Sequence, residues 1–271
     1  MIGDEGHRRS VRDALEHLGI RNLVLGIQDA CFPGAEEEDT GRGSPWSEAA
    51  LDLLRFVRSL GFDGIQLGPQ GETREGSPSP YEGTVFSRNT LSVSLPRLVT
   101  GEGPWSGLLA RDALAKVVAR RPEGSDVRVP YAFVYREHKR LLREAFAAFE
   151  SRNIRELRRG FEDFKREHGE WLERDALSHA LCCERRRATW ESWGGTGASL
   201  DSRLWNPRRG EASACDARRR ELRSRHATEM EFYRFKQFLA HDQHRSFRKG
   251  VRRLGLLLFG DLQAGLSRQD A

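Results

Sequence analysis

The residues best suited to chemistry follow two apolar segments that are predicted to be strands. The first strand covers residues 64–67, and a segment rich in Gly, Pro and Ser follows it at residues 68–90. The second covers residues 256–259 and is followed by an Asp. Because β/α folds build their sites at the carboxyl ends of strands, we expect a site here. The candidate substrate-binding residues are Ser79, Tyr81, Asn89 and Asp261.

Two of these residues have side chains that a ligand could use directly. Tyr81 has a flat apolar ring and a hydroxyl that can bond to another hydroxyl. Its alternative role is to anchor its own segment. Asp261 can accept hydrogen bonds from a ligand, or it can cap the next helix. Ser79 and Asn89 are expected mainly to hold the loop in shape, because short polar side chains in Pro-rich loops bond to nearby backbone.

Other groups of residues are weaker candidates. An acidic tract at residues 36–39 and Glu82 offer carboxylates, but a hydrolase that uses a pair of carboxylates needs them about 5 Å apart, and the tract is expected to be a solvated loop. His241 and His244 have the spacing of one helix face that could hold a metal, but no third ligand is evident. The GGTG run at residues 194–197 lacks the lysine of a phosphate-binding loop and is expected to be flexible.

The cysteines indicate neither disulfides nor a metal. No C-x-x-C pair is present, and no histidine is recognised at zinc-ligand spacing. A G-x-S-x-G elbow and a Cys/His nucleophile are also missing. The sequence therefore predicts no cofactor and no metal. The cysteines are Cys31, Cys182, Cys183 and Cys215.

The elements that carry the candidate residues are typical of a β/α architecture. Residues 22–27 form a continuous apolar run, as in strands that are covered on both faces. After a loop, Ser44 and Pro45 predict the N-cap and first residue of a helix, and Gly61 predicts its end. With the strand at residues 64–67 this is a βαβ unit, which implies a parallel sheet and a right-handed crossover.

The rest of the chain is predicted to be mainly helical. Apolar spacing over residues 131–187 predicts two or three amphipathic helices, and one long helix is expected from about residue 216 to 254. We divide the chain into a first βαβ portion (1–100), a helical insert (101–215), and a long helix with a third strand (216–271). The fold class is α/β: the first part of a TIM-type (β/α)8 barrel with a large helical insertion, incomplete here because closure takes eight strands.

Composition and charge favour a globular cytoplasmic protein. The 271 residues are 38% hydrophobic, and their net charge is +5. Arginine clusters at residues 185–187 and 218–220 are interleaved with glutamates, which is typical of a solvated face with ion pairs rather than a nucleic-acid site. No apolar run approaches the roughly 20 residues of a membrane helix, and the N-terminus has no apolar signal region. We expect neither nucleic acid nor a membrane as partner.

Several motifs occur in an order that points to one family. FPG at residues 32–34 is similar to S-L-P-G, and LGPQG at residues 67–71 is similar to L-G-P-T-G. SPY at residues 79–81, with Phe86 and Asn89, resembles S-P-Y-Q-S…F-A-G-N-P. These motifs resemble the amylomaltases, or 4-α-glucanotransferases, of glycoside hydrolase family 77. The positions that depart from the last motif are Glu82, Gly83, Arg88 and Thr90.

Later motifs extend the resemblance to most of the chain. WESW at residues 190–193, with Trp171 and Leu172, looks like the family's helical insert. The run from Phe232 to Leu239, which includes Gln237, resembles F-x-x-F-x-Q-x-L, and Gln243 follows it. GDL at residues 260–262 resembles G-D-[LM]-P, with Gln263 in place of the proline.

The resemblance implies a function and a site. The family transfers α-1,4-glucan segments with retention, so the implied ligand is an α-glucan or maltooligosaccharide, and Tyr81 with its loop and Asp261 would contact it. The family's catalytic carboxylates follow the G-D-L strand, so we expect no catalytic residue in this chain. It would be inactive alone unless a second polypeptide completes the barrel. The alternative is a non-catalytic glucan-binding or regulatory remnant.

Overall fold

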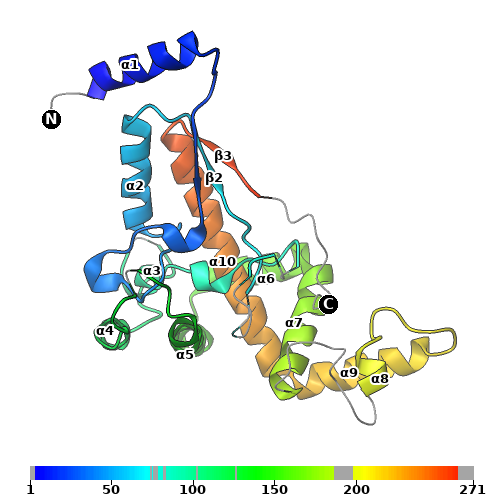
Figure 1. Ribbon diagram of the computed structural model, residues 1–271. Coiled ribbons are helices and arrows are strands. Elements are labelled where there is room, and N and C mark those ends of the chain that lie inside the picture. The colour runs from blue at the N-terminus through cyan, green and yellow to red at the C-terminus, as the bar shows by residue number, and fades with distance from the viewer. Residues whose placement is uncertain are drawn as a thin grey trace.

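The molecule consists mainly of helices and has one small parallel sheet (Figure 1). The computed structural model describes residues 4–73, 75, 79–81, 84–101, 103–125, 127–185 and 198–261. Strands β1 (Val24–Ile27), β2 (Gly64–Leu67) and β3 (Leu257–Phe259) form one sheet in the order β1-β2-β3. Both pairings are parallel, so the carboxyl ends of the strands meet at one edge. The predicted parallel α/β arrangement is confirmed.

Helix α2 (Glu48–Ser59) joins β1 to β2 and begins three residues later than expected. The predicted cap at Ser44 was wrong, because Ser47 caps the helix by accepting a hydrogen bond from the Ala50 N–H at 3.0 Å. Ser44 instead accepts from the Trp46 N–H and donates to the Ser92 carbonyl oxygen. The end was predicted correctly, since Gly61 has a φ of +95° there.

Several short elements and one separate helix complete the first part of the chain. Helix α1 (Asp4–His17) lies apart from the other helices in Figure 1. Its Arg8 side chain donates to the Ser59 carbonyl oxygen at the end of α2. The other elements are η1 (Asp29–Cys31), η2 (Glu36–Glu38), η3 (Thr90–Ser92), α3 (Pro96–Val99) and α4 (Arg111–Ala119).

The helical region has more breaks than the sequence predicted. Residues 131–185 form three helices, within the predicted two or three, but the expected single helix over residues 216–254 is two, α9 and α10. They are separated at His226, whose φ of −108° and ψ of 18° depart from helical values. The bounds are α5 (Tyr131–Ser151), α6 (Arg155–Glu167), α7 (Gly169–Arg185), α8 (Ala198–Asp201), α9 (Ala212–Arg225) and α10 (Ala227–Arg253).

Helix α10 forms the centre of the core. It contacts α2, α5, α6, α7, α9, η3 and β3, and Figure 1 shows it running from the sheet to the α7 end of the molecule. Its Phe235 and Phe238 are buried, and their ring centroids lie 5.1 Å from Phe149 and 5.5 Å from Phe161, respectively. Such aromatic contacts hold the helical region against the helix that leads into β3.

The predicted arginine face is confirmed in part, since Arg220 is exposed, Arg218 pairs with Glu221 and Arg219 pairs with Asp216. It was wrong for the half-buried Arg185 and Arg218. Arg185 and Arg218 both pair with Asp201, whose side chain is fully buried. Arg186 and Arg187, and the motifs at residues 190–193, 194–197 and 262–263, lie outside the described residues. The division at residues 100 and 215 stays a prediction. Among the described helices, none is long and apolar enough to cross a bilayer.

Candidate functional site

A cleft of about 340 Å³ opens at the carboxyl ends of β2 and β3. The loop after β2 forms one wall, α10 contributes a second, and the end of β3 a third. This is the edge of the sheet where the sequence predicted a site. The cleft is lined by Leu67, Pro69, Gln70, Gly71, Thr84, Val85, Phe86, Ser87, Arg88, His244, Arg248, Leu258, Phe259, Gly260 and Asp261.

The structure brings together Tyr81 and Asp261, the two residues whose side chains the sequence analysis expects to contact a ligand. The Tyr81 hydroxyl donates a hydrogen bond of 3.1 Å to Asp261 Oδ2, although the residues are 180 positions apart. This bond and the charge of Asp261 raise the pKa of Tyr81, so the phenol stays protonated and remains the donor. Tyr81 is 51% exposed, which leaves its ring accessible beside the cleft.

Asn89 faces its own loop and not the cleft. Its side-chain oxygen accepts hydrogen bonds from the Leu91 N–H at 3.0 Å and from the Thr73 hydroxyl at 3.4 Å. Its backbone N–H donates to the Gln70 carbonyl oxygen at 2.8 Å. Asn89 therefore closes the base of the 68–90 loop. Ser79 lies half-buried two residues before Tyr81.

Two glutamines of α10 each hold the backbone of one residue, and one of these residues, Arg88, lines the cleft. The Gln237 amide accepts from the Arg88 N–H at 2.8 Å and donates to the Arg88 carbonyl oxygen at 3.0 Å. Gln243 makes the same pair of bonds to Ser94, at 2.8 and 3.1 Å. Each glutamine satisfies both backbone groups of one residue. Sequence reasoning had both residues only as parts of motifs and gave them no positioning role.

A chain of buried polar groups orients the Arg88 side chain. Gln70 donates to both oxygens of Asp29, at 3.1 and 3.2 Å, and accepts from Arg88 Nη1 at 3.3 Å. Burial, together with the charge of Arg248, lowers the pKa of Arg88 to about 10, so its guanidinium is still charged at neutral pH. The cleft thus presents two guanidinium groups and the carboxylate of Asp261. Nothing local in the sequence distinguishes Arg88 as a cleft residue.

Glu72 links the 68–90 loop to α10. Its carboxylate accepts from Thr90 Oγ1 and from Gln237 Nε2, each at 3.2 Å, and lies 3.5 Å from Lys236 Nζ. Burial acts to raise the pKa of Glu72, but the charge of Lys236 and these bonds outweigh it and the pKa is lowered. The loop is therefore anchored by an ionised carboxylate inside the protein.

An exposed aromatic side chain forms one rim of the cleft. Phe86 is 60% exposed and stacks on Trp171, with ring centroids 6.2 Å apart. His241 stacks on the same tryptophan, and its Nε2 lies 3.2 Å from the Phe86 carbonyl oxygen. Burial lowers the pKa of His241 to about 3, so the imidazole is neutral and donates to that oxygen. Trp171 and His241 together support Phe86.

His244 and the acidic tract make contacts within the protein. His244 packs edge-on against Trp46, and burial lowers its pKa to about 2. The cluster of potential metal ligands found among the described residues contains neither His241 nor His244. In the tract, Asp39 pairs with Arg121, and no residue of 36–39 lines the cleft. Glu82 lies outside the described residues.

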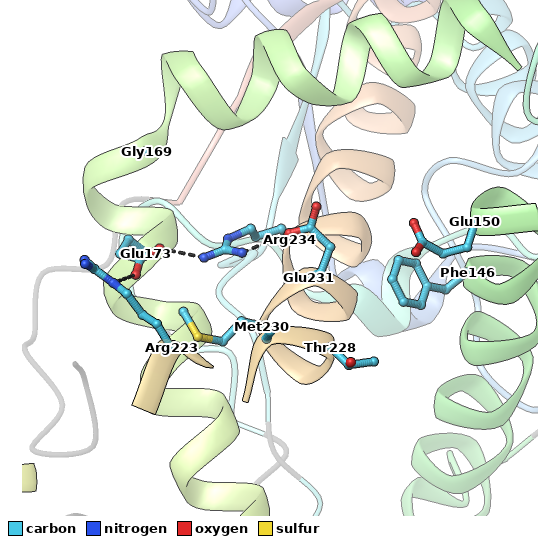
Figure 2. Close-up of a pocket in the computed structure, with 10 residues that line it drawn as sticks. Phe146, Glu150, Gly169, Glu173, Arg223, Thr228, Met230, Glu231 and Arg234 are labelled. Carbon is cyan, nitrogen blue, oxygen red and sulfur yellow. Dashed lines mark hydrogen bonds and ion pairs between the residues drawn. The ribbon is translucent and has the colours of Figure 1, made fainter. Parts of the chain in front are cut away.

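A second cleft, of about 610 Å³, lies between α5, α7 and α10 and also holds carboxylates. Figure 2 shows Arg234 reaching towards both Glu173 and Glu231, at 2.6 and 2.9 Å. Arg223 also pairs with Glu173. Because these charges neutralise one another, this second cleft presents a ligand with less uncompensated charge than the cleft at the ends of β2 and β3 does.

The expectation that no cysteine has a histidine partner was wrong. Cys183 Sγ lies 3.7 Å from Nε2 of His179, one turn earlier on α7, and Glu229 of α10 faces both. The H-x-x-x-C spacing was visible in the sequence, since residues i and i+4 share a helix face. The contribution of the Glu229 carboxylate from α10 was not visible in the sequence.

Comparison with known proteins agrees with the fold and the motifs. The family model described as 4-alpha-glucanotransferase matches residues 35–271. The 4-alpha-glucanotransferase of Thermus thermophilus is 27% identical over 223 residues, which are 82% of this chain and 39% of that protein. The chain thus spans well under half the length of this curated relative.

Two solved structures share the fold. The amylomaltase from Streptococcus agalactiae, in complex with acarbose, has a TM-score of 0.69 at 16% identity, over 89% of this chain and 43% of that one. The amylomaltase from Corynebacterium glutamicum has a TM-score of 0.56 at 18% identity, over 97% of this chain and 32% of that one. With a family model that matches most of its residues, the chain belongs to the 4-alpha-glucanotransferases of glycoside hydrolase family 77.

Proposed function

We propose that the cleft at the ends of β2 and β3 binds a segment of an α-1,4-glucan, as part of the substrate site of a 4-α-glucanotransferase. The observation that carries this proposal is the contact between Tyr81 and Asp261 at that edge of the sheet. A sugar ring packs its apolar face on an aromatic ring, while its hydroxyls bond to charged and polar groups. Phe86 and Tyr81 offer the rings, and Arg88 and Asp261 the charged groups.

The candidate residues have different roles in this proposal. Tyr81 and Asp261 contact the glucan directly. Ser79 belongs to the same binding segment, and Asn89 contributes by fixing the base of the loop that carries Tyr81. The ligand requires no cofactor in this role.

We propose further that the 271 residues alone do not carry out the transfer. A retaining reaction needs a nucleophilic carboxylate and an acid/base carboxylate about 5 Å apart. Among the described residues that line the cleft, Asp261 alone carries a carboxylate. The missing groups would come from further barrel strands of the same or a second polypeptide. The exposure of Leu257 and Phe259 on β3, 51% and 43%, supports such additional packing.

A non-catalytic glucan-binding protein is the second candidate, favoured by the same lone carboxylate in the cleft. The two candidates differ in what happens when the barrel is completed. Maltotriose incubated with the chain alone should stay unchanged by chromatography. Adding the missing strands should start disproportionation for a transferase and leave maltotriose intact for a binding protein. Robust disproportionation by the chain alone would overturn the claim of inactivity.

Calorimetric titration with maltodextrin tests the binding site itself. Tyr81→Ala removes the ring and the hydroxyl, so we expect affinity to fall about tenfold or more, which corresponds to roughly 1.4 kcal/mol. Tyr81→Phe keeps the ring and should lose only a few-fold. Phe56→Ala is the control, since Phe56 is 58% exposed on α2 and does not line the cleft. Equal binding by the native chain and Tyr81→Ala would exclude the proposed site.

A further inference from the structure

A cluster of three potential metal ligands joins α7 to α10, and the glucan site does not use it. His179 and Cys183 lie one turn apart on the same face of α7, and Glu229 comes from the first turn of α10. Helices α7 and α10 are in contact along this region. Imidazole, thiolate and carboxylate are the three ligand types that zinc takes in proteins.

The distances between the donor atoms match a tetrahedral site. Zinc bonds of the usual lengths place a sulfur about 3.6 Å from a nitrogen or oxygen, and a nitrogen about 3.4 Å from an oxygen. In the structure, Sγ of Cys183 lies 3.7 Å from Nε2 of His179 and 3.9 Å from Oε1 of Glu229. The distance from His179 Nε2 to Glu229 Oε1 is 3.4 Å.

The separation between His179 and Glu229 is long for a direct hydrogen bond. A charge-assisted N–H···O bond is about 2.7–2.9 Å, well below the 3.4 Å between His179 and Glu229. The three atoms are thus spaced as the corners of one face of a coordination tetrahedron. A cation above that face would reach all of them without a movement of the helices.

The surroundings orient the ligands. Arg143 of α5 pairs with Oε2 of Glu229, which turns Oε1 towards His179 and Cys183. Arg143 is itself held over the Phe232 ring, 4.3 Å from its centroid. Partners of this kind fix the geometry of metal-binding carboxylates.

We propose that His179, Cys183 and Glu229 bind a zinc ion that links α7 to α10. The thiolate and imidazole select zinc over the hard cations magnesium and calcium, which prefer oxygen ligands. Cys183 is exposed, so water takes the fourth position. One turn before His179, Asp175 accepts a hydrogen bond from Thr84 of the cleft loop. The ion therefore fixes the helix that also supports this loop.

Cobalt provides the direct test on the full 271-residue chain. After removal of metal with a chelator under reducing conditions, we expect Co²⁺ to bind one per chain. It should give the near-ultraviolet band of a cobalt–thiolate bond and the strong visible bands of tetrahedral cobalt. Zinc should displace it. Native chain that shows no thiolate band, or does not saturate with equimolar cobalt, would overturn the proposal.

Variants show whether these residues are the ligands. Cys183→Ser should abolish the thiolate band, and His179→Gln and Glu229→Gln should each weaken binding at least tenfold. Cys182→Ser, at the neighbouring cysteine, is the matched control and should keep the native spectrum. A thiolate band that persists in Cys183→Ser would refute the assignment. Circular dichroism establishes that each variant is folded.

Alkylation of cysteines in the native chain is a test that does not depend on the metal affinity of the variants. Iodoacetamide should alkylate Cys183 of the native chain, identified by peptide mass, and zinc should slow this reaction while leaving the alkylation of Cys31 unchanged. Both cysteines are exposed. Alkylation of Cys183 at the same rate with and without zinc would contradict the site.

Discussion

At the scale of single residues, the cleft depends on a side chain that supplies hydrogen bonds to the backbone of a loop residue. Gln237 holds both the N–H and the carbonyl oxygen of Arg88, and its amide nitrogen also donates to Glu72. A glutamine is suited to this position because one amide carries an acceptor and a donor. A glutamate has no donor at neutral pH.

We therefore expect Gln237→Glu to destabilise the protein and to weaken glucan binding. The substitution leaves the Arg88 carbonyl oxygen without its donor and places a carboxylate against Glu72, at a cost of about 2–3 kcal/mol in the free energy of unfolding. Urea denaturation measures this change. Gln243→Glu is the matched control: it should cost about 1–2 kcal/mol but leave maltodextrin affinity unchanged, since its partner Ser94 does not line the cleft. Equal losses of affinity in both variants would contradict this role.

The sequence could reveal some of the site residues and not others. Tyr81 and Asp261 could be predicted as candidates because each follows a predicted strand and lies in a recognisable motif. Their contact, across 180 positions, has no local signature. The bonds between Gln237 and Arg88 span 149 positions and could not be predicted for the same reason. For the ligand cluster, the spacing of His179 and Cys183 was visible, but the third ligand depends on how two helices pack.

At the scale of the elements, one buried carboxylate joins three helices. Asp201 at the end of α8 pairs with Arg185 of α7 and Arg218 of α9, and its side chain is fully buried. The hydrogen bond that Arg218 donates to Asp201 raises the pKa of Arg218 above its already high ordinary value. Its guanidinium therefore stays charged and needs this partner.

Asp201→Asn should accordingly be strongly destabilising. The substitution removes the negative charge between two half-buried cations, and breaking such a pair costs about 3–5 kcal/mol. Thermal unfolding followed by circular dichroism measures the effect. Asp216→Asn serves as the comparison, because its pair with Arg219 is on the surface, with 56% of the Asp216 side chain exposed, and should change stability by less than about 1 kcal/mol. Similar losses in the two variants would mean that burial of Asp201 does not matter.

Elements could be predicted where the residues that determine them lie close together in the sequence. The strands and the end of α2 were predicted because an apolar run and a glycine with positive φ act within a few residues. The break between α9 and α10 at His226 was not, since no Gly or Pro marks it. The cap of α2 was misplaced because Ser44 and Ser47 are equally suitable, and only the contact of Ser44 with Ser92 decides between them.

At the scale of the whole molecule, the buried His138 and His244 and the half-buried His241 make stability depend on pH. Burial lowers the pKa of His138 to about 3, of His241 to about 3 and of His244 to about 2. Each titrates near 6.5 in the unfolded chain. Between these values the unfolded state binds more protons than the folded state, so stability falls as the pH falls below about 6.5.

The expected slope is about 1.4 kcal/mol per pH unit for each of the three histidines. Free energies of unfolding from urea titrations at pH 7, 6 and 5 measure it. His138→Gln should retain the hydrogen bond to Thr40 and reduce the slope by about one third. A free energy that is constant over this range, or that rises towards pH 5, would contradict the burial of these groups as neutral imidazoles.

The order of the strands in the sheet has a consequence for how the chain is made. β2 ends at Leu67, but its neighbour β3 begins only at Leu257, so one edge of β2 is complete only after nearly all the described helices have been synthesised. At about 5–20 residues per second, ribosomes need roughly 10–40 s for that interval. During that time the nascent chain carries the unpaired edge of β2, which is open to pairing with other strands. The helical region thus sets the delay before β3 can complete the sheet.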